Sequence, residues 1–271
     1  MRANGIITLT TDFGVLDSYV GAMKGVVLGI APGAQLIDIT HTIEPQNLHQ
    51  AAYMIQSFYA YFPIGSVHLV AIDPGASNAR RPIVLLTPEA AFVAPDNGVL
   101  TYIWREALAR WGAAACLVVE LNRPGYWREN VSNTFHARDI FAPVAAYLAR
   151  GTNVRELGAV IDAMVEANLE QPTRGRGGEL VGRIIHIDAV GNCVTNIRPG
   201  HLLETGLLDQ PLIQVIDQQI VGVQRTYTDV ARGDLLALFG STDHLEVALR
   251  NGNAAKRLGV GIGDTVRVRG V

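Results

Sequence analysis

The sequence predicts an α/β N-terminal domain with a mostly parallel sheet, followed by a smaller, mostly β C-terminal domain. Three observations predict this architecture. Short apolar runs alternate with segments of helical periodicity in the first half of the chain, a polar and glycine-rich segment (QPTRGRGG) lies at residues 171–178, and short strand-like runs dominate the chain after it. We therefore predict a first domain at residues 1–170, a linker at 171–179 and a second domain at 180–271.

The start of the chain shows the alternation of strand and helix most clearly. Residues 6–10, 35–40 and 67–72 are apolar runs of strand length, and residues 17–30 and 47–62 carry apolar side chains at helical spacing. This order predicts parallel strands with helices packed on the sheet. In such sheets ligands bind beyond the carboxyl ends of the strands.

The later elements are shorter. Residues 83–87 and 91–93 predict a hairpin, and a helix is expected to end near residue 111. A further strand and helix of the first domain are expected at residues 116–121 and 140–149, with Asp139 as the helix cap. The second domain is expected to hold one helix, at residues 248–258, and strands at 180–188, 193–197, 212–216, 219–223, 234–239 and 265–268.

Composition limits the function. The 271 residues carry a net charge of −3 with no basic cluster, which argues against a nucleic-acid partner. The two cysteines, Cys116 and Cys193, predict neither a disulfide framework nor a metal site. No signal-peptide pattern and no run of membrane-spanning length occur, so we expect a cytoplasmic protein without membrane contact.

Common catalytic motifs are missing from the sequence. It contains no P-loop, no Rossmann glycine fingerprint, no metal-spaced His/Cys cluster and no G-x-S-x-G elbow. We therefore expect no metal and no cofactor. The remaining candidates for chemistry are polar side chains at predicted loop tips.

The segment HLVAIDPGASNARRPIVLL, which starts at His68, is the most informative of these. It predicts a strand, a Pro-Gly turn and a second strand, with Asp73 at the end of the first strand and Arg80 before the second. A carboxylate facing an arginine stays ionised and fixed in direction. The alternative is a surface salt bridge that closes an ordinary loop.

Other polar residues occupy similar positions, and each has a plain structural explanation. Asp12 and Asp17 could cap a helix, His136 could simply begin one, and Asp188 could belong to a hairpin turn. Tyr227 could be a core residue. The full set of candidates is Asp12, Asp17, Asp73, Arg80 and His136 in the first domain and Asp188, Asn192, Tyr227 and Ser241 in the second.

Six motifs, found in one order along the chain, indicate a function for these candidate residues. TLTTDFG and DSYVGAMKG are followed by AIDPG with Arg80, then APDNG, TFHARDIFAP and IDAVGNCVTNI. Together they resemble the S-adenosylmethionine (SAM) hydroxide adenosyltransferase family, whose relatives include adenosyl-fluoride and adenosyl-chloride synthases. The resemblance covers nearly the whole chain. It implies an α/β domain, a β-barrel-like second domain and a homotrimer with sites between subunits.

The activity implied by this resemblance is hydrolysis of SAM to adenosine and L-methionine. The family's catalytic Asp, Arg and His correspond to Asp73, Arg80 and His136. A water held by this triad would attack C5′ of the ribose, and the cationic sulfur would leave without a general acid. The halide-using relatives lack the Asp/His pair, which favours water as the nucleophile.

The resemblance also implies how the substrate is bound. Asp12 would accept the two ribose hydroxyls, Asn192 would read the edge of adenine, and Tyr227 would stack on the adenine ring. Asp17 and Asp188 would lie near the methionine ammonium, and Ser241 near its carboxylate. Two alternatives stay open: a halide-dependent adenosyl transferase, and a protein that binds SAM or adenosine without turnover.

Overall fold

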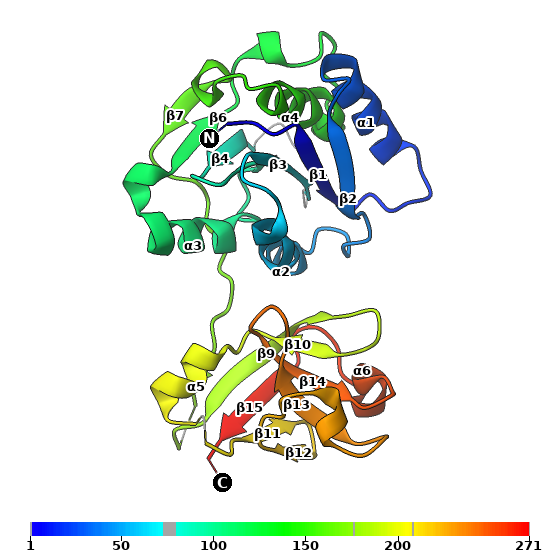
Figure 1. Ribbon diagram of the computed structural model, residues 1–271, viewed down its shortest axis with the longest axis vertical. Coiled ribbons are helices and arrows are strands. Elements are labelled where there is room, and N and C mark those ends of the chain that lie inside the picture. Colours follow the sequence, from blue (N-terminus) through cyan, green and yellow to red (C-terminus); the bar gives the residue numbers. More distant parts are fainter. Residues whose placement is uncertain (1, 73–79, 176, 208, 271) are drawn as a thin grey trace. The chain divides into compact units, whose positions relative to one another are not determined.

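The computed structural model describes residues 2–72, 80–175, 177–207 and 209–270 (Figure 1). The chain forms two compact units, Met1–Asn168 and Leu169–Val271. Each unit has its own sheet and its own hydrophobic core.

Unit 1 is built on a seven-stranded mixed sheet. Four strands at one side (β2, β1, β3 and β5) pair in parallel, and β4, β6 and β7 continue the sheet in antiparallel pairing. The predicted α/β class is thus confirmed, with the parallel part limited to half of the sheet. In sheet order the strands are β2 (Gln35–Thr40), β1 (Ile6–Thr11), β3 (Ser66–Ala71), β5 (Ala90–Pro95), β4 (Pro82–Leu86), β6 (Leu117–Glu120) and β7 (Ala159–Ile161).

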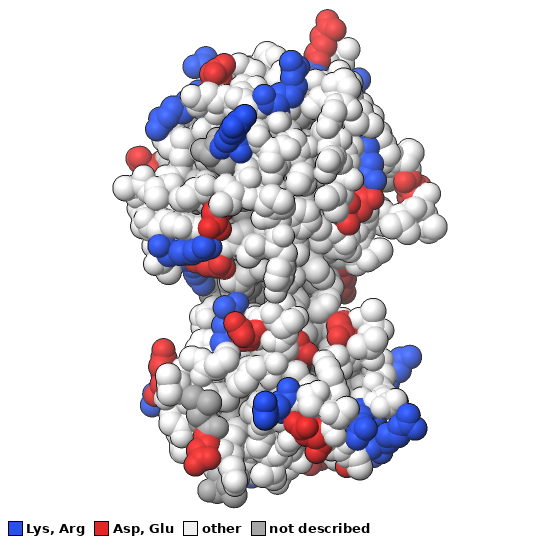
Figure 2. Space-filling view, in the orientation of Figure 1, with Lys and Arg blue, Asp and Glu red and all other residues white. Residues whose placement is uncertain are grey.

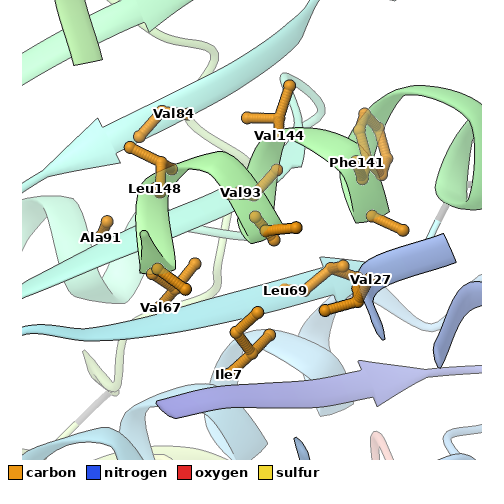
Figure 3. Packing of buried hydrophobic residues seen from close by; sticks show 14 of the residues in the cluster. Ile7, Val27, Val67, Leu69, Val84, Ala91, Val93, Phe141, Val144 and Leu148 are labelled. Carbon is orange, nitrogen blue, oxygen red and sulfur yellow. The ribbon is translucent and has the colours of Figure 1, made fainter. Parts of the chain in front are cut away.

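Helices cover both faces of this sheet (Figure 1). On one face α1 (Tyr19–Ile30) and α4 (Ala142–Ala149) bury apolar side chains against β1, β3 and β5, as Figure 3 shows for Val27, Val144 and Leu148. On the other face α2 (Leu48–Phe58) and α3 (Thr101–Trp111) pack on the alternate strand residues. The two apolar faces of the central strands explain why those strands read as continuous apolar runs.

Several short helical segments complete unit 1. A π-helical segment, η4 (Ala137–Phe141), leads directly into α4. The 3₁₀ segments are η1 (Tyr59–Tyr61), η2 (Ala113–Ala115), η3 (Pro124–Tyr126) and η5 (Val154–Glu156).

Unit 2 is an antiparallel sheet that nearly closes on itself. Its order is β12 (Gln218–Val221), β11 (Leu212–Val215), β15 (Thr265–Arg269), β9 (Leu180–Ile187), β10 (Cys193–Thr195), β14 (Leu245–Leu249) and β13 (Leu235–Phe239). Gln224, which follows β12, donates its backbone N–H to the Ala237 carbonyl of β13 (2.7 Å), so the two edge strands approach each other. The barrel-like β character expected for this domain is confirmed.

Smaller elements flank the sheet of unit 2. Within the predicted linker, β8 (Thr173–Arg174) pairs with β9. The helical segments are α5 (Pro199–Thr205), the 3₁₀ segment η6 (Tyr227–Asp229) and α6 (Ala254–Leu258).

The helix predicted at residues 248–258 is wrong over its first half. β14 extends to Leu249, and the chain then turns through Asn251, whose φ is +60°. Helix α6 begins only after Asn253, whose side chain accepts a hydrogen bond from the Lys256 N–H (2.7 Å). An asparagine is a favoured N-cap, and this cap fixes the helix start.

Charged side chains are interspersed on the surface. On the face shown in Figure 2, lysine and arginine alternate with aspartate and glutamate over the described residues. None of the helices in the described ranges has the length and apolar character needed to cross a bilayer.

Candidate active site

The polar candidates of unit 1 lie at the carboxyl edge of its parallel strands. Asp12 directly follows β1, and Arg80 lies just before β4, whose first residue pairs with the last residue of β5. His136 is the residue before the π-helical segment η4. Asp73 lies outside the described residues.

Asp12 is held by the loop that follows β2. One of its carboxylate oxygens, Oδ2, accepts a hydrogen bond from the backbone N–H of Gln46 (3.0 Å). Gln46 adopts a left-handed conformation (φ +66°), which is uncommon for a residue with a side chain. The next turn of the Asp12 loop is fixed as well, because the Gly14 N–H donates to the His41 carbonyl (2.7 Å).

A series of contacts between polar side chains supports the Asp12 loop. The buried Thr11 hydroxyl lies 2.9 Å from Nδ1 of His41, and it also accepts the Phe13 N–H (3.3 Å). Nε2 of His41 lies 3.1 Å from Asp38, without the alignment of a hydrogen bond. Asp38 also pairs with Lys24 at 2.5 Å. These contacts tie the ends of β1 and β2 together on either side of Asp12.

A cavity of about 90 Å³ opens at the same edge. Its walls come from the loop after β1, the end of β3 and the start of η4. Of the lining residues that the structure describes, only His136 is titratable; they are Phe13, Ala71, Thr134, Phe135, His136, Ala137 and Phe141. The rings of Phe13, Tyr19 and Phe135 meet edge to face, with centroids 5.4–6.0 Å apart. The arrangement places His136 among mostly apolar lining residues.

Asp139 fixes the turn that carries His136. Its fully buried carboxylate accepts hydrogen bonds from Arg138 (2.7 and 2.8 Å), Arg128 (2.8 Å) and the Ser132 N–H (2.8 Å). Burial acts to raise the pKa of Asp139, but these donors outweigh it and bring the pKa to about 2. The predicted role of Asp139 as the helix cap is wrong: it lies inside η4, and its partners are arginines and a loop amide.

Unit 2 gathers its own candidates around the turn between β9 and β10. Oδ1 of Asp188 accepts the backbone N–H groups of Val190, Gly191 and Asn192 (2.8–3.0 Å). Its other oxygen accepts the side-chain amide of Asn192 (2.9 Å). The same amide nitrogen lies 3.4 Å from the Tyr227 hydroxyl. Three of the candidate residues predicted from sequence therefore form one hydrogen-bonded group.

Glu246 belongs to this group and was missed by the sequence analysis. It is a buried residue of β14 that hydrogen-bonds Tyr227. Burial, with the nearby charge of Asp188, raises the pKa of Glu246. Gly240 leaves the space that the carboxylate needs, because a Cβ there would collide with it. A single carboxylate among apolar strand residues is the signal that could have found Glu246.

The remaining candidates are more exposed. Tyr227 is 42% exposed, so the core role considered for it is wrong. Ser241 is exposed and follows Gly240 in the turn between β13 and β14. Asp17 is an exposed loop residue, and α1 begins after Ser18 without a side-chain cap, so Asp17 does not cap that helix.

The fold and the polar groups define a class: a two-unit protein with an α/β unit and a nearly closed β unit, each carrying a cluster of carboxylates and hydrogen-bonding side chains. Within residues 2–72, 80–175, 177–207 and 209–270, no group of His, Cys, Asp and Glu side chains is arranged to hold a metal ion.

Sequence comparison identifies the family within this class. The model of the SAM hydroxide adenosyltransferase N-terminal domain matches residues 7–158, and that of the C-terminal domain matches residues 182–267. The chain belongs to the SAM hydroxide adenosyltransferase family, as its motifs predict.

Individual relatives agree with this placement. An (R)-S-adenosyl-L-methionine hydrolase of Salinispora tropica is 36% identical, with 97% of each chain covered. A fluorinase of Actinoplanes sp. is 26% identical, with 92% of each chain covered. Among solved structures, an uncharacterized conserved protein from Thermotoga maritima is 34% identical, with a TM-score of 0.87 over 97% of this chain and 99% of that one.

Proposed function

We propose that the protein hydrolyses SAM to adenosine and L-methionine. One observation carries the proposal: four relatives at 32–36% identity, each aligned over 95% or more of both chains, are named (R)-S-adenosyl-L-methionine hydrolase. Their name specifies the R configuration, so we include a preference for SAM with the R configuration at sulfur. The histidine-lined cavity at the edge of the α/β sheet is consistent with attack by water.

The reaction is a displacement at a carbon atom. The oxygen of water attacks C5′ of the ribose while the C5′–S bond breaks, and the bonding electron pair goes to sulfur. Methionine leaves as a neutral thioether, so its departure needs no proton donor. The attacking water loses one proton and becomes the 5′-hydroxyl of adenosine. Catalysis therefore depends on holding the water in line with the C5′–S bond.

We assign the water to Asp73, Arg80 and His136. His136 is a partly exposed side chain on the wall of the cavity, and Arg80 approaches the same edge of the sheet from the start of β4. A histidine can accept a hydrogen bond from water, and a neighbouring arginine can hold and polarise it. Asp73 would orient these two groups.

Substrate binding would draw on both units. Asp12 keeps one carboxylate oxygen beyond its bond to Gln46, and two oxygens suit two ribose hydroxyls. Asn192 and the exposed ring of Tyr227 would receive adenine. We assign Asp17 and Asp188 to the ammonium group of methionine, and Ser241 to its carboxylate.

The proposal has three further parts, all based on the family resemblance or the sequence. The protein would use no cofactor, because the leaving group is already activated by its positive charge. It would act as a homotrimer with sites between subunits. It would work in the cytoplasm, where its substrate is a metabolite rather than a nucleic acid or a membrane component.

The test is product analysis by chromatography with mass detection. The protein is incubated separately with the R and S sulfonium epimers of SAM. We expect adenosine and methionine in equal amounts, formed faster from the R epimer. If no adenosine appears from either epimer while both bind, the protein is a SAM-binding protein without turnover and the proposed activity is wrong.

A halide-dependent transferase is the second candidate, because fluorinases are relatives at 22–26% identity. The same assay with excess chloride separates the two functions. A hydrolase gives adenosine at an unchanged rate. Formation of 5′-chloro-5′-deoxyadenosine would identify a halide-using enzyme.

A further inference from the structure

The APDNG motif, residues 94–98, has no role in the site described so far. It begins at the end of β5 and reaches the same sheet edge as Asp12 and His136. Its two polar side chains, Asp96 and Asn97, are buried, with exposed fractions of 5% and 9%. Buried polar groups are costly unless they are hydrogen-bonded, so their partners show what they do.

Asn97 holds the end of β3. Its side-chain Nδ2 donates to the carbonyl of Ile72 (2.8 Å), the residue immediately before Asp73 in the chain. A second hydrogen bond sets the orientation of the Asn97 amide: its Oδ1 accepts the Val99 N–H (3.1 Å). The donor is therefore directed at the point where β3 ends.

Asp96 holds the start of β4. Its Oδ2 accepts two hydrogen bonds from the Arg81 guanidinium, from Nε (3.1 Å) and Nη2 (2.6 Å). The backbone of the same two residues is also joined, since the Asp96 N–H donates to the Arg81 carbonyl (2.9 Å). Arg81 is the neighbour of Arg80, so this pair fixes the chain beside the second member of the proposed triad.

The motif also contacts the last residues of unit 1, which follow β7 and end at Asn168. Oδ1 of Asp96 accepts the Val165 N–H (2.6 Å). Gly98 lies against Ala167 in a left-handed conformation (φ +92°), and a Cβ at Gly98 would approach the Ala167 nitrogen to 2.5 Å. Asp96 is thus bonded on both oxygens, and Gly98 leaves no space for a side chain beside Ala167.

The geometry points to Asp96 and Asn97 as positioning residues for hydrolysis: they hold Ile72 and Arg81, the residues that come directly before Asp73 and directly after Arg80 in the sequence. This inference rests on the proposed function. Neither side chain needs to touch the substrate. Their effect is on the alignment of the attacking water, and misplacement of a catalytic group by about 1 Å can cost about 100-fold in rate.

Two nearly isosteric variants test the inference. Asn97→Asp keeps the acceptor for Val99 but turns a carboxylate toward the Ile72 carbonyl, so attraction becomes repulsion. Asp96→Asn places an amide NH₂ against either Arg81 or the Val165 N–H, both of which are donors. We expect kcat to fall about 10- to 100-fold in each variant, while KM and the Kd for adenosine stay within about threefold.

Thr87→Val is the matched control. Thr87 is buried at the opposite end of the same β4–β5 hairpin, where its hydroxyl donates to the Ala90 carbonyl (3.1 Å). This variant should lower the melting temperature and leave kcat at 25 °C unchanged. A purely structural role for Asp96 and Asn97 would make their variants behave like Thr87→Val.

Hydrogen exchange gives a second readout that does not depend on activity. We expect faster exchange in peptides containing Ile72 or Arg81 in both motif variants, and wild-type exchange there in Thr87→Val. Unchanged exchange or unchanged kcat in Asn97→Asp and Asp96→Asn would overturn the inference, as would parallel losses of kcat and adenosine affinity. A wild-type protein that releases no adenosine would instead refute the proposed function, and the exchange data would still decide whether the motif holds these two residues.

Discussion

Asp12 shows how much of this site is set by single backbone contacts. Its carboxylate is oriented by the Gln46 N–H, and Gln46 is itself in an uncommon left-handed conformation. The adjoining turn is held through His41, by its carbonyl and by its ring. A carboxylate fixed in this way loses little further freedom when it binds a ligand, which favours affinity.

We predict that Asp12→Asn weakens binding of both SAM and adenosine. The amide keeps the shape but replaces one acceptor by a donor, next to the Gln46 N–H donor and the two ribose hydroxyls. Charge-assisted hydrogen bonds contribute about 1.5–3 kcal/mol each, so the Kd should rise at least about 10-fold. Calorimetry with adenosine measures the change.

The control for this variant is Asp162→Asn, which alters an exposed carboxylate just after β7. It should bind adenosine as the wild type does. If Asp12→Asn also keeps wild-type affinity, Asp12 does not belong to the ribose site.

At the scale of elements, β3 combines a functional end with a buried histidine in its middle. His68 is completely buried, and its ring lies near those of Phe58, Phe62 and Phe92, with centroids 4.9–5.7 Å apart. Nδ1 pairs with the Thr8 hydroxyl (2.8 Å), and Nε2 has no hydrogen-bond partner among the described residues. Burial lowers the pKa of His68 to about 3.

This pKa makes the stability of unit 1 sensitive to acid. Between pH 6.5 and about 3 the unfolded chain binds a proton at His68 that the folded chain does not. Stability from this group is therefore complete above pH 6.5 and falls by about 1.4 kcal/mol per pH unit below it. Denaturant titrations from pH 7 to pH 4 measure the slope.

The matched double variant is His68→Phe with Thr8→Val, which fills the same space without a titrating group or an unpaired hydroxyl. Its slope should be smaller than that of the wild type by about one proton. An identical slope would show that His68 is not responsible. The other histidines of the chain remain in both proteins and cancel in the comparison.

Local sequence patterns predict an element correctly where its contacts in the fold favour the same structure. They fail where contacts with residues distant in the sequence favour a different one. The strands β1, β2 and β3 were predicted within a residue or two, because each is a short run rich in Ile, Val, Leu and Thr. The first half of the helix predicted at residues 248–258 failed, because β14 continues to Leu249 and Asn253 starts the helix late. For Asp139, the sequence showed a possible cap, but its partners Arg128 and Ser132 come from the preceding loop.

The same division holds for the candidate site. Asp12, Asp188 and Asn192 could be named from motifs, since each lies at a predicted turn or loop tip. Tyr227 lies in none of the six motifs and was named only from the family resemblance. Glu246 could not, because its meaning depends on its burial beside Asp188 and Tyr227 from another strand.

At the scale of the whole molecule, we propose that the two units have different roles. Unit 1 carries a histidine-lined cavity at the edge of parallel strands, where the C5′ reaction would be promoted. Unit 2 carries a preformed group of carboxylate, amide and phenol side chains suited to a nucleoside and an ammonium group. The main requirement of the proposed reaction is a water held in line with the C5′–S bond.

The central claim is that water is the nucleophile at C5′. The most direct measurement uses SAM in water enriched in heavy oxygen, with mass spectrometry of both products and His136→Ala as the reference variant. We predict one heavy oxygen in the 5′-hydroxyl of adenosine, none gained by methionine, and much slower labelling in the variant. Heavy oxygen found only in methionine, or a nucleoside formed without it, would contradict the claim.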